Sequence, residues 1–170
     1  IKTHLVEKMN SHCKRPTVFF DRDGVLNWEI HGRGVTHHTE LSLFDNSAGA
    51  VKLVNDAGWL AILATNQPQV AKGFTSFKQL DLIHSKLETF LGYQNAKLDQ
   101  IYFCPHHQQK GFEGEVPELK INCDCRKPGY AMLQKAFEEM PIDIQQSCMI
   151  GDSWRDVGTA RGAGIYAYGV

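Results

Sequence analysis

Two carboxylates separated by a single residue, Asp21 and Asp23, follow directly after the apolar run 17–20. A run of β-forming residues that stops at polar ones predicts a buried strand. The carboxylates then lie just past its C-terminal end, where open α/β sheets place their ligand crevice, and Gly24 allows a sharp turn there. Two carboxylates this close favour a bound cation or phosphate chemistry, although an Asx-type turn that closes the strand would use the same residue types.

Polar side chains also follow two other apolar runs. Thr65 and Asn66 come directly after the second run, and Asp152 comes just after a later one. Because the carboxyl ends of parallel strands meet at one edge of a sheet, we expect these side chains to converge on the first carboxylate pair.

The chain between these residues alternates between strand and helix patterns. Short apolar runs predict strands, and apolar residues at helical spacing predict helices. The alternation indicates an α/β fold, with a Rossmann-like, mainly parallel sheet and helices on both faces. Strands are expected at 17–20, 59–64, 100–103, 147–150 and 165–168, and helices at 47–56, 77–91, 130–140 and 155–163.

The side chains expected at that edge suit phosphoryl transfer. A carboxylate can act as a nucleophile, and a second carboxyl group can protonate the leaving oxygen and then activate water. Lys127 can offset phosphoryl charge, and Asp152 with Asp156 adds oxygen ligands of the kind that Mg²⁺ prefers. The chain has no glycine-rich phosphate loop followed by Lys-Ser or Lys-Thr, which argues against a P-loop nucleotide hydrolase.

The composition is that of one globular domain, with 170 residues, 42% hydrophobic and 22% charged. A net charge of -1 argues against nucleic acid or an anionic membrane as a partner, and no apolar run approaches membrane-spanning length. Residues 1–16 are expected to be a leader or linker, and 17–170 the functional domain. The leader lacks a signal-peptide core, and five cysteines fit poorly with a disulfide framework, so the expected compartment is the reducing cytoplasm.

Two short-spaced groups of metal-binding residues bracket an irregular stretch. Cys104 and His106 precede it, and Cys123 and Cys125 follow it. Three thiolates and one imidazole complete a tetrahedral Zn²⁺ site, which leaves no open position for catalysis and predicts a structural role. The alternatives are free thiols with a solvated histidine, or His107 as the fourth ligand.

Four motifs carry a resemblance to a known family. The segment 21–27, Asp-Arg-Asp-Gly-Val-Leu-Asn, resembles the first motif of the haloacid dehalogenase superfamily, and 65–67, Thr-Asn-Gln, resembles the second. Lys127 resembles the third, and 151–156, Gly-Asp-Ser-Trp-Arg-Asp, resembles the fourth. All four occur in the family's order and cover nearly the whole chain. The resemblance implies a haloacid dehalogenase-like fold and a Mg²⁺-dependent phosphoric monoester hydrolase that works through an aspartyl-phosphate.

The same resemblance implies a role for each residue. Asp21 is the expected nucleophile and Asp23 the expected general acid/base. Thr65 and Asn66 are expected to bind the transferring phosphoryl oxygens, and Lys127 to neutralise their charge. Asp156, the last residue of the fourth motif, has an alternative role: its carboxylate would stabilise the first turn of the following helix. The implied Mg²⁺ ligands are Asp21, the backbone carbonyl of Asp23, Asp152 and, directly or through water, Asp156.

The cysteine-containing stretch narrows the resemblance. Cys-Pro-His-His at 104–107 and Cys-Asp-Cys-Arg-Lys-Pro at 123–128 resemble the D-glycero-D-manno-heptose 1,7-bisphosphate phosphatases and the related histidinol-phosphate phosphatases, a branch without a cap domain. Arg126 resembles a residue that contacts the sugar-linked phosphate, although an exposed arginine would look the same. A fixed guanidinium suits a second phosphate, which histidinol phosphate lacks, so the heptose bisphosphate is the first expected substrate. Thr65, Asn66 and Gln67 are the other expected substrate-binding residues.

The sequence departs from the family pattern near the expected substrate. Pro68 and Lys72 stand where a small residue and an arginine are usual, and the spacer 107–122 is long. The alternatives are therefore histidinol phosphate or another small sugar phosphate as substrate, and a catalytically silent zinc-bearing interaction domain as another class. The chain does not begin with Met, so the expected state is a monomer or part of a fused sugar-pathway enzyme.

Overall fold

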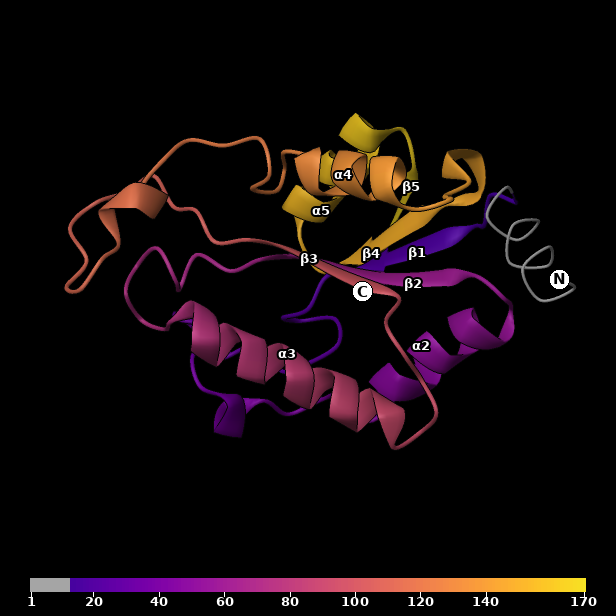
Figure 1. Ribbon diagram of the computed structural model, residues 1–170, viewed down its shortest axis with the longest axis horizontal. Coiled ribbons are helices and arrows are strands. Elements are labelled where there is room, and N and C mark those ends of the chain that lie inside the picture. Colours follow the sequence, from indigo (N-terminus) through magenta and orange to yellow (C-terminus); the bar gives the residue numbers. More distant parts are fainter. Residues whose placement is uncertain (1–12) are drawn as a thin grey trace, which may run out of the picture.

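The computed structural model describes residues 13–170, which form a five-stranded parallel sheet (Figure 1). The strand order is β3-β2-β1-β4-β5, and every neighbouring pair is parallel. The predicted α/β class with a parallel sheet is therefore confirmed. The strands are β1 (Thr17–Phe20), β2 (Leu60–Asn66), β3 (Gln100–Cys104), β4 (Cys148–Gly151) and β5 (Tyr166–Gly169).

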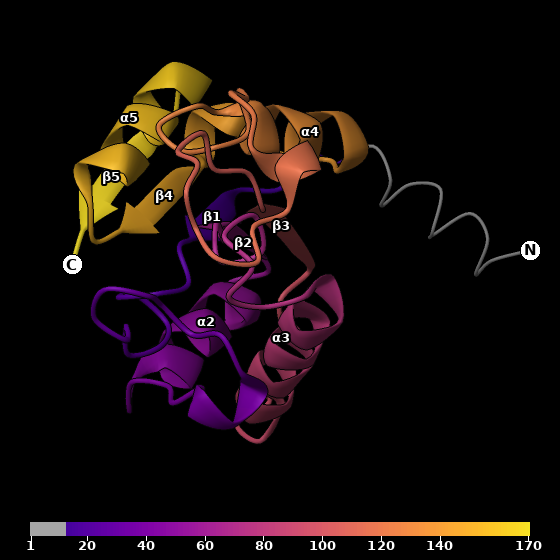
Figure 2. The ribbon, with the colours of Figure 1, turned by 90° about the vertical axis from the view of Figure 1, so that its left-hand side faces the viewer.

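Helices cover both faces of this sheet, as the alternating pattern predicted. Figure 2 shows α2 and α3 on one side of the strands and α4 and α5 on the other. Within residues 13–170, the connections between strands hold only helices, short 3-10 turns and loops. The helices are α2 (Ser47–Asp56), α3 (Phe77–Gly92), α4 (Ala131–Glu139) and α5 (Trp154–Ala163), and the 3-10 turns are η1 (His38–Glu40), η2 (Pro117–Leu119) and η3 (Ile144–Gln146).

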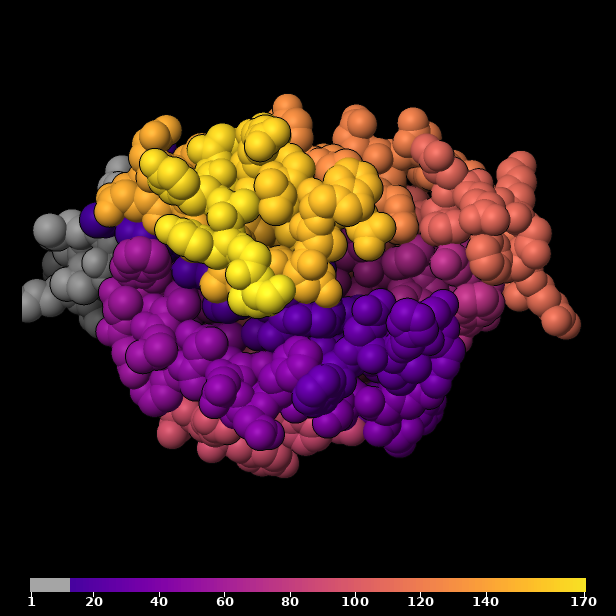
Figure 3. All heavy atoms as spheres, turned by 180° about the vertical axis from the view of Figure 1, so that it is seen from behind, coloured from indigo at the N-terminus to yellow at the C-terminus, as the bar shows by residue number. Residues whose placement is uncertain are grey.

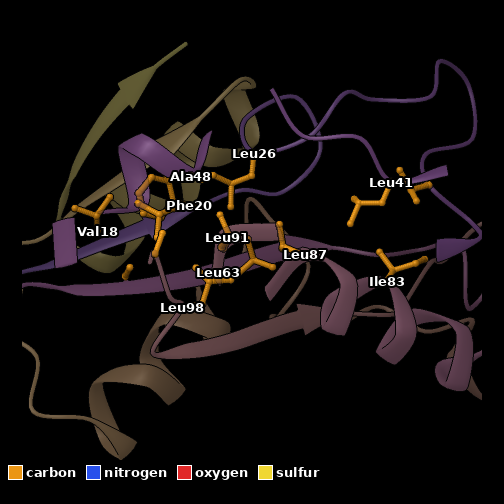
Figure 4. Close-up of a cluster of buried hydrophobic side chains, with 14 residues drawn as sticks. Val18, Phe20, Leu26, Leu41, Ala48, Leu63, Ile83, Leu87, Leu91 and Leu98 are labelled. Carbon is orange, nitrogen blue, oxygen red and sulfur yellow. The ribbon is translucent and has the colours of Figure 1, made fainter. Parts of the chain in front are cut away.

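Alternate residues of the central strand serve two separate cores. Phe20 packs with α2 and α3, and Figure 4 shows it beside Leu63 of β2, with Leu87 and Leu91 of α3 nearby. Phe19 points to the opposite face, where its ring meets Phe137 edge-on at 6.0 Å. Each such aromatic side chain stabilises the fold by roughly 1.5–3 kcal/mol through burial alone. The end of β1, where the catalytic motif begins, is therefore anchored from both sides.

Two helix starts differ in how they are capped. Ser76 caps α3, because its hydroxyl accepts from the Gln79 N–H at 3.1 Å. Ser47 does not cap α2 but is its first residue. The Ser47 hydroxyl instead donates to the Leu26 carbonyl at 2.7 Å, which ties α2 to the loop after β1.

The ends of the described chain lie against the domain. The Arg15 N–H donates to the Pro141 carbonyl at 2.7 Å, so this part of the expected leader contacts the domain. The other leader residues, 1–12, lie outside the described residues, and the boundary at 17 stays a prediction. Figure 3 shows the C-terminal strand and helix in yellow above the indigo segment that follows β1, and Val170 shares a groove with Val25 there.

Among the residues that the structure describes, no helix has both the length and the apolar character needed to cross a membrane.

Candidate active site and metal centres

The carboxyl edge of the sheet holds a polar cavity of about 180 Å³. Every strand end that the sequence singled out contributes to its wall, so the predicted convergence is confirmed. The second motif differs slightly from expectation, because Thr65 and Asn66 are the last residues of β2 rather than the first of a loop. The predicted residues that line the cavity are Asp21, Asp23, Thr65, Asn66, Arg126, Lys127 and Asp152.

Asp21, which follows directly after β1, lies beside the buried ammonium group of Lys127. Lys127 Nζ is 2.8 Å from Asp21 Oδ2 and 2.5 Å from Asp156 Oδ1. Asp21 Oδ1 accepts from the Arg22 backbone N–H at 2.7 Å. Burial, helped by the nearby Asp156 carboxylate, raises the pKa of Asp21 above its usual value, although Lys127 opposes the shift. One cation therefore serves two carboxylates, which leaves a net negative site suited to an additional cation.

Asp23 is held by four side-chain N–H donors from three residues. Arg22 grips it through Nη2, at 3.1 Å from Oδ1 and 3.0 Å from Oδ2, with Nε at 3.4 Å from Oδ1. Asn27 Nδ2 donates to Oδ1 and Gln67 Nε2 donates to Oδ2, both at 2.9 Å. Burial by itself would raise the pKa of Asp23, but Arg22 and these hydrogen bonds lower it overall. The carboxylate is thus fixed in orientation at the cavity wall.

Asn66 and Gln67 perform positioning work that the sequence did not reveal. The Asn66 amide donates to the Lys127 carbonyl at 3.2 Å and accepts from the Lys127 N–H at 2.9 Å, which clamps the third motif to the end of β2. Gln67, predicted to bind substrate, is 1% exposed and lies behind the cavity wall. Its amide also donates to Thr65 Oγ1 at 3.1 Å. Gln67 thereby links the Thr65 hydroxyl to the Asp23 carboxylate.

A candidate Mg²⁺ site lies where three carboxylates meet. Asp21, Asp152 and Asp156 each offer an oxygen within 4.8 Å of the others. Gly24, with φ +83°, is required there because a Cβ would collide with the Asp152 carboxylate. Asp156 is already engaged, since Oδ1 pairs with Lys127 and Oδ2 accepts from the N–H and hydroxyl of Ser153. This hard, oxygen-only donor set fits Mg²⁺, with the exposed Asp152 the freest of the three ligands.

The four predicted zinc-binding residues come together beside this cavity. Their donor atoms lie within 4.8 Å of one another, and the individual contacts range from 3.1 Å (Cys104 to Cys125) to 3.7 Å (Cys104 to His106 Nδ1). Thiolates that share a tetrahedral Zn²⁺ at about 2.3 Å would stand about 3.8 Å apart, so the cluster fits the ion with slight expansion. A hydrogen bond from Cys104 lowers the pKa of Cys125 to about 5, whereas burial raises that of Cys123. His107, the alternative ligand, bonds the Gln109 carbonyl at 3.2 Å instead.

Arg155 is a cavity residue to which sequence reasoning gave no role. It lies in the fourth motif and lines the cavity with Arg126. Burial, together with the Arg155 charge, lowers the pKa of Arg126. The position of Arg155 between Asp152 and Asp156 of the fourth motif was the signal available in the sequence. Glu29, Gly34, Pro68, Gln69 and Ser153 complete the wall.

The long spacer of the cysteine-containing stretch packs onto the loop after β2 (Figure 1). The Val116 N–H donates to the Ala71 carbonyl at 3.0 Å. Lys72 Nζ lies 5.0 Å from the centroid of the Phe112 ring, and Phe74 meets that ring edge-on at 5.7 Å. Two departures from the family pattern, Lys72 and the long spacer, are therefore in direct contact.

Comparisons with known proteins first define the class. A family model described as HAD-hydrolase-like matches residues 124–170, which contain the third and fourth motifs. A solved structure of D,D-heptose 1,7-bisphosphate phosphatase from B. bronchiseptica, complexed with magnesium and phosphate, superposes with a TM-score of 0.79 at 29% identity, over 91% of this chain and 79% of that one. The fold is that of the HAD-like hydrolases.

Full-length relatives then narrow the class. The D-glycero-beta-D-manno-heptose-1,7-bisphosphate 7-phosphatase of Rhodopseudomonas palustris is 36% identical over 89% of this chain and 81% of its own length. The D-glycero-D-manno-heptose-1,7-bisphosphate 7-phosphatase of Thermosynechococcus vestitus is 39% identical over 89% and 76%. The chain belongs to the D-glycero-D-manno-heptose-1,7-bisphosphate 7-phosphatase family.

Proposed function

We propose that the chain is a Mg²⁺-dependent phosphatase that removes one phosphate from D-glycero-D-manno-heptose 1,7-bisphosphate. The observation that carries this proposal is the cavity itself. Two carboxylates, Asp21 and Asp23, face a space flanked by Lys127, with two arginines at its rim. Family membership supports the substrate, since the relatives at 36–39% identity carry that name.

Asp21 would attack phosphorus, so that a new Oδ–P bond forms as the bond to the sugar oxygen breaks. Asp23 would give a proton to the departing alcohol and then take one from the water that cleaves the aspartyl-phosphate. Asp23 is held ionised by Arg22, but a bound phosphoryl dianion next to it favours the protonated form. Lys127 and Thr65 would hold the non-bridging oxygens of the group in transfer.

Asp21, Asp152 and the Asp23 carbonyl would hold Mg²⁺, and the ion would supply neutralisation of phosphoryl charge. We assign Asp156 a positioning role, because it is 1% exposed, does not line the cavity, and its oxygens accept from Lys127 and from both donors of Ser153. It would orient the ammonium group and cap α5 rather than bind the ion directly.

We further propose that Cys104, His106, Cys123 and Cys125 hold a structural Zn²⁺. All four positions of a tetrahedral site would be filled by protein, so the ion would have no place for substrate or water. Its role would be to fix both ends of the long spacer beside the cavity. The reducing compartment, the boundary at 17 and a monomeric or fused state remain predictions.

The second phosphate is the feature that separates the candidate substrates. Arg126 donates to the His106 carbonyl at 3.2 Å, which positions its guanidinium at the cavity rim near Arg155. Two adjacent guanidinium groups repel each other and are favoured by a shared anion. Histidinol phosphate carries no second phosphate, so it would leave this pair unsatisfied.

The test is phosphate release from both anomers of the heptose 1,7-bisphosphate and from histidinol phosphate, with and without Mg²⁺. We expect Mg²⁺-dependent release from a bisphosphate anomer, lost in Asp21→Asn. We also expect Arg126→Lys to raise KM for the bisphosphate about tenfold or more, because a bidentate contact is lost, with little effect on histidinol phosphate. Preferred turnover of histidinol phosphate would overturn the substrate, and no release from either would overturn the activity.

A further inference from the structure

A buried arginine sits between the proposed general acid/base and a buried histidine. Arg22 is 0% exposed and reaches Asp23 with Nη2 and Nε on one edge of its guanidinium. On the other side, its Nη1 lies 3.4 Å from Nε2 of His84, which is 6% exposed and comes from α3. Three side chains from the first motif and a distant helix thus form a continuous buried row.

The direction of hydrogen bonding in this row is fixed by chemistry. A guanidinium group has donors and no acceptor, so Nε2 of His84 must accept from Arg22 and the ring proton must be on Nδ1. The ring is therefore neutral. Burial and the Arg22 charge together lower the pKa of His84 to about 3, which keeps it neutral throughout the working range.

We infer that His84 is a positioning residue that fixes the plane of the Arg22 guanidinium and, through it, the orientation of the Asp23 carboxylate. This inference rests on the proposed role of Asp23 as general acid/base. His84 lies in none of the four motifs and does not line the cavity. It acts at a distance, through the side chain that grips Asp23 most extensively.

The other contacts of Asp23 cannot replace this row. Asn27 and Gln67 each hold one carboxylate oxygen through one N–H. Two single contacts allow the carboxylate to tilt, whereas the planar guanidinium that spans both oxygens defines its plane. Without the acceptor at position 84, one edge of Arg22 loses its partner in a buried setting. The Arg22 guanidinium is then free to rotate, and the Asp23 carboxyl group, the proposed proton donor, can rotate with it.

The variant to test is His84→Leu, which fills the space but offers no acceptor. His84→Gln is the conservative variant, because its amide oxygen can accept from Arg22. Asp23→Asn supplies the reference signature for loss of the general acid. Leu87→Val, one turn further along α3 in the core, is the control for a loss of stability without contact to Arg22.

The readout is kcat/KM for two Mg²⁺-dependent substrates with different leaving groups, because kcat/KM reports steps up to phosphorylation of the enzyme. The heptose bisphosphate releases an alcohol that needs a proton, whereas p-nitrophenyl phosphate releases a stable phenolate that does not. For His84→Leu we expect about a 10- to 100-fold loss with the bisphosphate, since a small misplacement of a catalytic group can cost that much. With p-nitrophenyl phosphate we expect less than about a threefold loss, and an unchanged KM for the bisphosphate.

The outcomes separate this inference from the proposed function. Rescue by His84→Gln to within about threefold of wild type, with Leu87→Val unaffected, would support positioning through the acceptor. If Asp23→Asn shows the leaving-group signature and His84→Leu does not, the positioning role is wrong while the function stands. Equal losses on both substrates, matched by Leu87→Val at the same melting temperature, would reduce His84 to a packing residue. If Asp23→Asn keeps full activity on both substrates, the proposed function itself fails.

Discussion

The buried histidine of α3 makes a specific prediction about stability and pH. His84 has its pKa lowered from 6.5 to about 3 by burial and by Arg22. Between these two values the folded protein keeps the ring neutral while the unfolded chain binds a proton there. The unfolded state binds more protons, so the free energy of unfolding must fall as pH falls from 6.5 towards 3.

The size of the effect follows from the pKa shift. One pH unit within this window is worth about 1.4 kcal/mol per group, so a drop to pH 5 costs about 2 kcal/mol from His84 alone. The full shift would cost about 5 kcal/mol at pH 3, which is comparable to the whole stability of a marginal domain. His84→Gln removes the titration while retaining an acceptor for Arg22, so its stability should lack this component.

The assay is urea unfolding of wild type and His84→Gln at pH 7.5 and pH 5, followed by tryptophan fluorescence. The other histidines, the carboxylates and the candidate zinc ligands are the same in both proteins, so their contributions cancel in the difference. We expect the wild type to lose about 2 kcal/mol more than the variant between the two pH values. Equal losses would refute the reasoning, because they would mean that His84 is protonated as readily in the folded chain as in the unfolded one.

Three further predictions concern the site and its candidate metals. Gly24→Ala should lower stability by about 1–2 kcal/mol and weaken Mg²⁺ binding measured by calorimetry, because the new Cβ meets the Asp152 carboxylate at a positive φ; unchanged affinity would show that the carboxylate is not a ligand. Cys125→Ser should reduce bound zinc well below one equivalent by atomic absorption and lower the melting temperature, and a variant that retained the metal would contradict the proposed ligand set. Lys127→Met should abolish phosphatase activity and cost about 3–5 kcal/mol at pH 8, because its two carboxylate partners lose their cation. Part of that stability should return at pH 5 as a carboxylate takes up a proton, and an identical loss at both pH values would contradict the pairing.

Patterns that repeat along the chain predicted the fold well. The apolar runs predicted all five strands to within two residues at either end. For β1 and β2 the reason is burial on both faces, which leaves no need of polar residues, whereas β5 is exposed at all four positions. The sequence predicted the buried face of α3 less completely than it predicted the strands. Phe77, at the start of this helix, is 46% exposed, while His84 occupies a buried position on its apolar face. The presence of the polar His84 on an apolar helix face was the signal in the sequence for its contact with Arg22.

The contacts that orient the site were not predictable from local patterns. The motifs named most of the cavity residues because the first, second and fourth motifs lie at strand ends, and parallel strands end at one edge, whereas Lys127 reaches the cavity from the loop before α4. The orientation of those residues depends on pairs that are distant in sequence, such as Asn66 with Lys127 and Arg22 with His84. Gln67 illustrates the difference, since its motif placed it at the site while its buried amide faces Asp23 rather than the cavity.

The long spacer shows how a candidate metal site and a backbone contact can together fix the position of a loop. Closing a long loop costs conformational entropy, and that cost grows only slowly with length once the ends are fixed. The cysteine and histidine cluster fixes both ends of the spacer 107–122. Its middle then needs only one tight contact, which Gly73 provides, because any side chain there would collide with the Gly114 carbonyl. The spacer is thereby held against Lys72, so loop length and the residue at position 72 are coupled through this contact and are best tested together.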